Sequence, residues 1–175
     1  SHASAQYCTP DNRFTEASVF SHDQIDSAIN VKYGSATNFY GITQDLLLNI
    51  YYPSASAETL PKRPLIVLMH GGLFLTGNKD NMNQACREFA LRGFAAATVG
   101  YRLGWDFVPN CQSVTPSTVI SSNRAIFMAI QDLHASIRFL VNHADTYSID
   151  TSWIFSGGVS AGAFASADMA FITPE

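Results

Sequence analysis

Charge is scarce in this chain of 175 residues: only 14% of them are Asp, Glu, Lys or Arg, and the formal net charge is -4. A surface with so few basic groups does not suit the phosphate backbone of a nucleic acid or an anionic lipid surface, so we expect no nucleic-acid partner. The hydrophobic share of 47% excludes intrinsic disorder and predicts a globular domain with a sizeable core.

Long apolar stretches are missing as well. Uninterrupted runs such as residues 65–69 are far shorter than the roughly 20 residues that a transmembrane helix needs, so we expect no membrane span. The segment Ala3-Ser4-Ala5 has the small-x-small pattern found before signal-peptidase cleavage sites. Together with the low charge and the many Asn, Ser and Thr residues, it favours a secreted or periplasmic protein. Residual vector sequence is the alternative origin of these residues.

Cysteine is rare, and its three residues are an odd number, so at least one thiol is free or pairs outside the chain. Cys86 lies in a stretch of helical spacing and is expected to be a buried free thiol. Cys8 and Cys111 lie in loop-like sequence and could form a disulfide in an exported protein. The chain has no Cys-x-x-Cys or His-x-x-x-His spacing, so we assign no metal site and no cofactor.

Apolar runs alternate along the chain with segments of helical spacing. The runs predict strands at residues 25–33, 45–52, 64–69, 94–99 and 153–155. The helical segments are residues 80–91, capped by Asn78 or Asp80, residues 124–143, and a run of small residues after residue 162. Residues 1–22 are expected to wrap the outside and residues 104–122 to form a long connection. This alternation predicts an α/β fold with a mostly parallel sheet and helices on both faces.

One turn carries a pattern with chemical meaning. Residues 153–155 are bulky and strand-favouring, and Gly158-Val159-Ser160-Ala161-Gly162 follows them before a helix-compatible run. A serine at the apex of so sharp a turn has a strained backbone, and only glycine fits two residues to either side. The turn would also point the Ala161 N–H toward whatever binds at Ser160. The alternative is a small-residue turn without chemistry.

A second glycine-rich turn, His70-Gly71-Gly72, follows the strand predicted at residues 64–69. Ligands of parallel sheets bind at the carboxyl ends of the strands, and both turns lie at such ends. A serine hydroxyl that attacks an ester needs a base, and the carbonyl oxygen needs hydrogen-bond donors. The two turns are placed to supply amide donors from opposite sides.

These motifs resemble the α/β-hydrolases, specifically the carboxylesterase/lipase branch with an His-Gly-Gly oxyanion turn. The matching segments are His70-Gly71-Gly72-Leu73-Phe74 with Gly77-Asn78, Tyr101-Arg102-Leu103, Gln131-Asp132 and Gly157-Gly158-Val159-Ser160-Ala161-Gly162. The resemblance implies an α/β-hydrolase fold, Ser160 as the nucleophile, and the amides of Gly72, Leu73 and Ala161 as oxyanion donors. It also implies that His70 supports the oxyanion turn rather than acting as the base.

Three further expectations concern the surroundings of this site. Leu73 stands where the family often has a third glycine, which would narrow the acyl side of the pocket. Arg102 follows a buried strand, where an unpaired charge is costly, so we expect an ion pair with Asp132. Trp105 and Phe107 would line the pocket, with a role as mere cover for the sheet edge as the alternative.

The chain departs from the family pattern in one respect. The family's acid and histidine follow the serine in chain order, but the residues after Ser160 include Asp168 and Glu175 and no histidine. Asp168 lies about two helical turns from Ser160 and is not expected to be the acid. We therefore expect residues 1–175 to be the N-terminal part of a single α/β-hydrolase domain. A missing C-terminal part or a second polypeptide would complete it and supply the acid and the histidine.

The predicted function is hydrolysis of a small-molecule carboxylic ester through an acyl-enzyme on Ser160. Hydrolysis of amides or peptides by the same groups is one alternative. A binding or adhesion module that keeps the fold without catalysis is the other.

Overall fold

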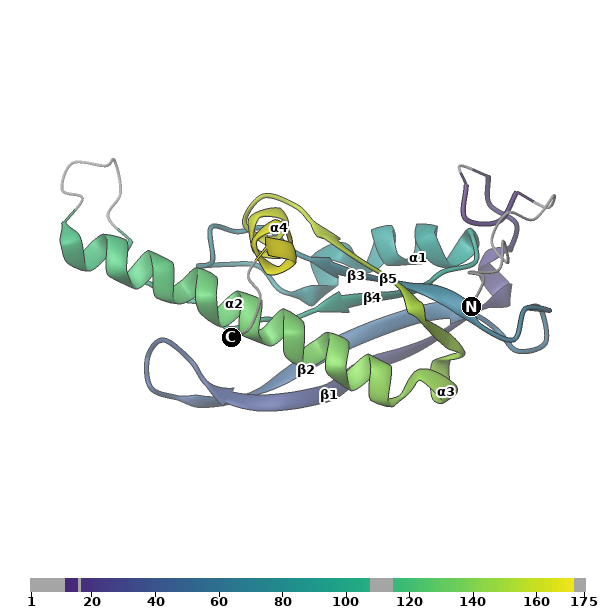
Figure 1. Cartoon of the computed structure of the whole chain (residues 1–175), viewed down its shortest axis with the longest axis horizontal. Helices are drawn as coiled ribbons and strands as arrows, with labels where there is room; N and C mark the ends of the chain where they lie inside the picture. The colour runs from purple at the N-terminus through teal and green to yellow at the C-terminus, as the bar shows by residue number, and fades with distance from the viewer. Residues whose placement is uncertain (1–11, 16, 108–114, 172–175) are drawn as a thin grey trace.

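The computed structural model describes residues 12–15, 17–107 and 115–171, which form five strands, four α-helices and two short 3₁₀ turns (Figure 1). In chain order the elements are η1 (His22–Gln24), β1 (Ile25–Thr37), β2 (Thr43–Pro53), β3 (Arg63–Met69), η2 (Lys79–Met82), α1 (Asn83–Leu91), β4 (Ala95–Val99), α2 (Pro116–Asn142), α3 (Ala144–Tyr147), β5 (Ile149–Gly158) and α4 (Ala161–Phe171).

The strands form one mixed sheet in the order β1-β2-β4-β3-β5. β2 is antiparallel to β1 and β4, whereas β3 is parallel to β4 and β5. The predicted α/β sheet is thus confirmed, with its parallel part made of β4, β3 and β5. In this part Met69 at the end of β3 pairs with Gly158 at the end of β5. The turns that follow these two strands therefore start side by side.

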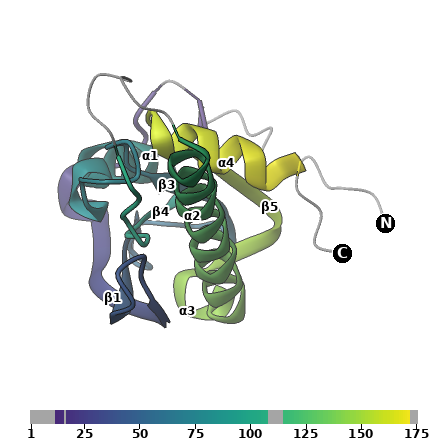
Figure 2. The same cartoon turned by 90° about the vertical axis from the view of Figure 1, so that its left-hand side faces the viewer.

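Helices cover both faces of the sheet. On one face α1 packs on β2 and β4, and Tyr51, Leu68 and Cys86 belong to the core there. On the other face α2 and α4 pack against each other (Figure 2), over a core that includes Leu48 and Val67. This arrangement buries both sides of the central strands, which explains why their sequences are continuously apolar.

The thiol of Cys86 is free and fully buried, as predicted, and burial raises its pKa to about 12. Cys8 and Cys111 lie outside the described residues, so their disulfide stays a prediction.

Two helices begin at other positions than predicted. α2 begins at Pro116 and not at residue 124, because the Thr115 side chain accepts a hydrogen bond from the Thr118 amide and proline is tolerated at the first helical position. The segment before α1 starts as η2, with Asn78 as its cap. Despite the length of α2, no helix within the described ranges has the length and apolar character to cross a membrane.

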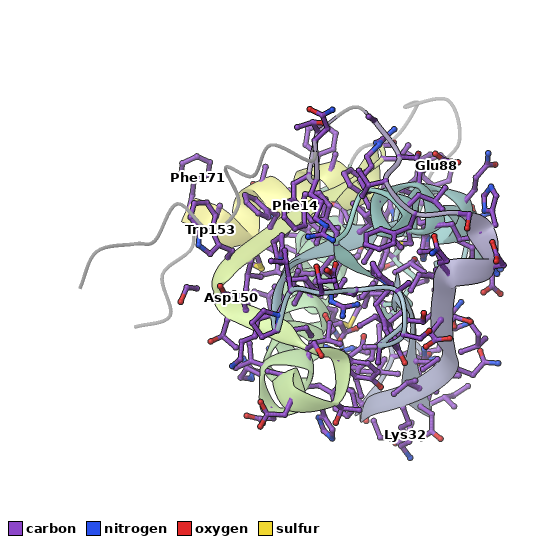
Figure 3. All side chains as sticks on the ribbon, turned by 90° about the vertical axis from the view of Figure 1, so that its right-hand side faces the viewer. Phe14, Lys32, Glu88, Asp150, Trp153 and Phe171 are labelled. Carbon is purple, nitrogen blue, oxygen red and sulfur yellow. The ribbon has the colours of Figure 1, made fainter. Side chains whose placement is uncertain are left out.

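The strand that leads to Ser160 is less buried than its neighbour β3. β5 lies at the edge of the sheet, and its residues Trp153 and Phe155 are 40% and 44% exposed. Trp153 projects from the same side of the molecule as Phe171 of α4 (Figure 3), which is 85% exposed. The predicted apolar run is real, but the described part of the chain covers only one side of it.

Candidate active site

Ser160 lies at the turn between β5 and α4 and has a φ of 51°, a left-handed value that L-residues seldom adopt. Gly158 and Gly162 flank Ser160 at positions where a side chain would not fit. A Cβ atom on Gly158 would lie 2.6 Å from the Met69 carbonyl oxygen, and one on Gly162 would lie 2.6 Å from that of His70. The strained serine and the two small neighbours are the features of a nucleophile elbow.

The turn after β3 lies directly against this elbow. A Cβ atom on Gly71 would lie 3.0 Å from the Val159 carbonyl oxygen and 3.2 Å from the Cβ atom of Ser160. The Val159 amide in turn donates to the Met69 carbonyl over 3.1 Å. The structure thus brings the two glycine-rich turns into contact at Ser160.

His70 fixes the direction of the first amide of this turn. Its Nδ1–H donates to the Gly71 carbonyl oxygen over 2.7 Å. A carbonyl oxygen only accepts, so Nδ1 carries the proton, and burial lowers the pKa of His70, which favours this neutral ring. The C=O and N–H groups of a trans peptide point in opposite directions. By holding the Gly71 carbonyl, His70 therefore turns the Gly72 N–H the other way.

The next peptide is held by the turn itself. The Gly72 carbonyl accepts hydrogen bonds from the amides of Leu75 and Thr76 over 2.9 Å and 3.0 Å. This fixes the Leu73 N–H, which shares the peptide with that carbonyl. Within residues 12–15, 17–107 and 115–171, the amides of Gly72, Leu73 and Ala161 meet no hydrogen-bond acceptor. Three donors at the two touching turns are therefore free to bind a ligand oxygen.

None of the described histidines hydrogen-bonds to Ser160, as a catalytic base would. His70 is 1% exposed and stacks on Tyr101 with ring centroids 4.3 Å apart, while its Nδ1–H is used on Gly71. His143 donates from Nδ1 to the Phe139 carbonyl at the end of α2. In the part of the chain that the structure describes, no histidine hydrogen-bonds to Ser160. Nor do three His, Cys, Asp or Glu side chains gather there as a metal site would require.

The predicted ion pair behind the site is confirmed. Arg102 Nη2 lies 2.8 Å from Asp132 Oδ1, and the Arg102 amide donates to Asp132 Oδ2 over 2.8 Å. Burial raises the pKa of Asp132, and the hydrogen bonds from Arg102 oppose that rise. The pair ties the segment after β4 to α2.

Trp105 makes a contact that the sequence did not suggest. Its indole Nε1–H donates to the Leu73 carbonyl oxygen over 2.8 Å, so this side chain reaches the oxyanion turn itself. Phe107 packs edge-on against Trp105 and is 45% exposed. Val159, beside Ser160 in the elbow, is 54% exposed, because the described chain places nothing over the outer side of the elbow.

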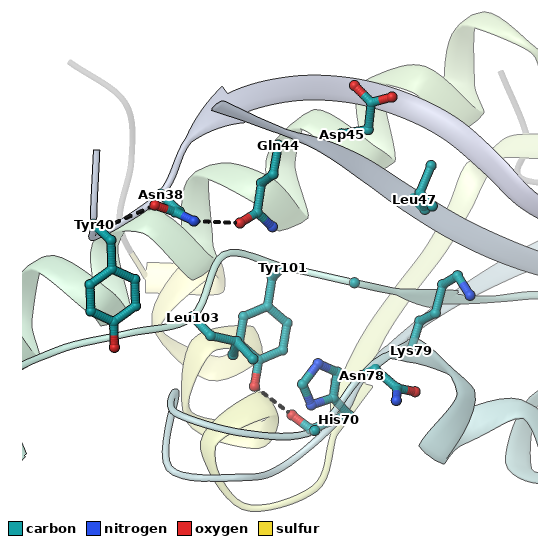
Figure 4. Close-up of a pocket in the computed structure, with 12 residues that line it drawn as sticks. Asn38, Tyr40, Gln44, Asp45, Leu47, His70, Asn78, Lys79, Tyr101 and Leu103 are labelled. Carbon is teal, nitrogen blue, oxygen red and sulfur yellow. Dashed lines mark hydrogen bonds between the residues drawn. The ribbon is translucent and has the colours of Figure 1, made fainter. Parts of the chain in front are cut away.

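A cavity of about 420 Å³ lies beside His70 (Figure 4), with Gln44, Asn78, Lys79 and Tyr101 among its lining residues. Figure 4 also shows the Tyr101 hydroxyl donating to the His70 carbonyl, over 2.8 Å. The lining contains none of the four residues that the sequence predicted for the chemistry. The cavity is thus separate from the elbow: His70 lines it, and Ser160 does not.

Comparison with known proteins gives matches in sequence and in structure. Residues 48–174 match the family model described as BD-FAE. Neuroligin-like protein glit-1 of Caenorhabditis elegans is 31% identical over 119 residues, which are 67% of this chain and 15% of that protein.

Solved esterases share the architecture. A bacterial heroin esterase is 25% identical with a TM-score of 0.57, and the match covers 87% of this chain and 41% of that one. For esterase 2 of Thermogutta terrifontis the identity is 25%, the TM-score 0.58, and the coverage 85% and 46%. Esterase B of Lactobacillus rhamnosis, at 22% identity and a TM-score of 0.62, shows the fold alone, over 95% and 43% of the chains. The chain spans less than half the length of these esterases.

Proposed function

Because the chain belongs to the BD-FAE family and has the α/β-hydrolase fold of solved esterases, we propose that it carries the nucleophile and the oxyanion donors of a carboxylic ester hydrolase. One observation supports the proposal above all others. The elbow of Ser160 touches a second turn, and three amides at these turns have no acceptor among the described residues.

In the proposed reaction the Ser160 Oγ attacks the carbonyl carbon of the ester while a base accepts its proton. The carbonyl oxygen becomes an oxyanion that accepts hydrogen bonds from the amides of Gly72, Leu73 and Ala161. Each such donor is worth about 3–4 kcal/mol in the transition state. Collapse of the intermediate breaks the bond to the leaving oxygen, which takes the proton from the base and departs as the alcohol, and an acyl-enzyme remains. The base then accepts a proton from water, whose oxygen attacks the acyl carbon and releases the acid and free Ser160.

The base must come from outside the described residues. We propose that a further polypeptide segment, on this protein or on a second chain, docks at the exposed edge of β5 and supplies the histidine and its acid. The apolar side chains around that edge support this: Trp153, Phe155 and Phe164 are 40%, 44% and 68% exposed. Exposed apolar surface on an edge strand and on the helix that follows it marks an interaction site.

A fluorophosphonate tests the proposal, because it reacts only with a serine that is activated by a base and an oxyanion hole. We call this chain together with the segment that supplies the histidine and its acid the completed hydrolase. It should gain the mass of one phosphonyl group on the peptide that contains Ser160. The Ser160→Ala variant should gain no mass. The control is Ser166→Ala, which alters a serine of α4 whose hydroxyl donates a hydrogen bond to the Ser156 hydroxyl, and it should label as the wild type does.

The same sample separates the alternatives. Cleavage of p-nitrophenyl esters without cleavage of matched anilides would favour an esterase over an amidase or peptidase. If the completed protein neither labels nor cleaves either substrate, the esterase proposal fails. The chain would then be a binding module that keeps the hydrolase fold. The lack of a hydrogen bond between Ser160 and a histidine among the described residues would agree with that result.

A further inference from the structure

One short segment after β4 donates hydrogen bonds to three carbonyls of the oxyanion turn. The Tyr101 hydroxyl donates to the His70 carbonyl, the Gly104 amide donates to the Phe74 carbonyl, and the Trp105 indole donates to the Leu73 carbonyl, each over 2.8 Å. Of these, the Trp105 bond is made by a side chain to a residue that is also a proposed oxyanion donor.

The turn that these bonds hold is strained. Leu73 and Phe74 have φ values of 54° and 59°, and neither is glycine. Left-handed residues of this kind cost on the order of 1–3 kcal/mol each and persist only where the surroundings hold them. Leu73 is also 58% exposed, so packing of its own side chain does little to fix the backbone. Hydrogen bonds to its two flanking peptides must do so instead.

Both flanking peptides of Leu73 are in fact bonded. The peptide before it is fixed through the Gly72 carbonyl, which accepts from the amides of Leu75 and Thr76. The peptide after it is fixed through the Leu73 carbonyl by Trp105. Two held planes determine the φ and ψ of the residue between them. The Leu75 and Thr76 amides reach the Gly72 carbonyl only while Leu73 and Phe74 keep these left-handed dihedrals. Without the second plane Leu73 is free to relax toward an ordinary conformation. The two bonds to the Gly72 carbonyl are then lost, and the Leu73 N–H, which shares a peptide with that carbonyl, turns away.

We propose that Trp105 is a positioning residue for ester hydrolysis: its indole N–H holds the Leu73–Phe74 peptide and so keeps the Leu73 amide directed at the oxyanion. This inference rests on the proposed function, in which Leu73 is a donor. Trp105 itself does not touch the reacting atoms. The competing role is packing, since the indole ring also lies edge-on to Phe107 at 5.3 Å.

The test uses the completed hydrolase with two variants. Trp105→Phe keeps an aromatic ring but removes the N–H, whereas Phe107→Leu removes the ring contact and keeps the N–H. With p-nitrophenyl acetate, Trp105→Phe should lower kcat about tenfold, since a displaced donor loses part of the 10²–10³-fold effect of one oxyanion hydrogen bond. KM should change less than about twofold, because the lost interaction belongs to the transition state. Phe107→Leu should change neither constant more than about twofold.

A second readout does not depend on turnover. In ¹⁵N spectra the amide resonances of Leu73 and Phe74 should move or broaden in Trp105→Phe and stay in place in Phe107→Leu. Unchanged resonances in Trp105→Phe, or an equal loss of kcat in Phe107→Leu, overturn the inference. If the wild type cleaves no ester, the proposed function fails, and the resonances alone decide whether Trp105 positions the turn.

Discussion

At the scale of single residues, Gly157 and Gly158 are neighbours in β5, yet a methyl group would meet different surroundings at each. A Cβ atom on Gly158 would lie 2.6 Å from the Met69 carbonyl oxygen, whereas one on Gly157 would lie 3.5 Å from the Leu68 side chain, an ordinary contact. Overpacking of this kind costs about 1–3 kcal/mol. Gly158→Ala should therefore lower Tm by about 3–10 °C and reduce fluorophosphonate labelling of Ser160. Gly157→Ala should leave both unchanged, and equal effects would contradict the elbow geometry.

His70 makes stability depend on pH in a stated direction. Burial lowers the pKa of His70 in the folded state, so below about pH 6.5, the usual histidine value, the unfolded chain binds a proton that the folded chain resists. The contribution of neutral His70 to the free energy of unfolding should be complete above that pH. It should decrease as the pH falls toward the pKa of His70 in the folded state. His70→Asn keeps a donor for the Gly71 carbonyl without an ionisable ring. Urea unfolding between pH 7 and 5 should show a shallower decrease for this variant, and equal slopes would contradict the assignment.

At the scale of elements, much of the sheet is readable from the sequence because burial on both faces forces continuous apolar runs. Residues 64–69 illustrate this, since β3 is bounded by Arg63 and Met69 and is almost wholly buried. The start of α2 also has a sequence signal, an N-cap Thr115 followed by Pro116. The polar residues that follow interrupt the apolar spacing of a helix, so the spacing alone did not predict this start. The edge position of β5 was not readable, because strand order depends on contacts between distant segments.

The link between the segment after β4 and α2 is an ion pair whose loss should be costly. Asp132→Asn would leave the buried guanidinium of Arg102 without its charged partner, and breaking such a pair costs about 3–5 kcal/mol. We expect Tm to fall by about 6–20 °C. Asp145→Asn is the matched control, because that carboxylate is exposed at the short helix α3. A fall of similar size in the control would show that the effect is general loss of charge.

At the scale of the whole molecule, the sequence predicted the positions of the two glycine-rich turns better than it predicted what surrounds them. Local rules decide where a glycine-flanked serine ends a strand, so Ser160 and the turn at Gly72 could be placed from spacing alone. The contact of Trp105 with Leu73 could not, because it joins two turns through the fold and has no local signal. For the same reason the sequence could suggest that a histidine is needed but could not show which surface receives it.

The exposed side of β5 gives the last prediction. Phe155, 44% exposed, lies on the edge strand, and Ile42, 63% exposed, lies in the connection between β1 and β2. A charge on an edge strand blocks pairing with another strand. Phe155→Lys should therefore reduce self-association of the isolated chain in sedimentation velocity, and in the completed protein it should reduce fluorophosphonate labelling of Ser160. Ile42→Lys adds the same charge away from β5 and should change neither the self-association nor the labelling. If both variants behave alike, the edge of β5 is not where the rest of the hydrolase docks.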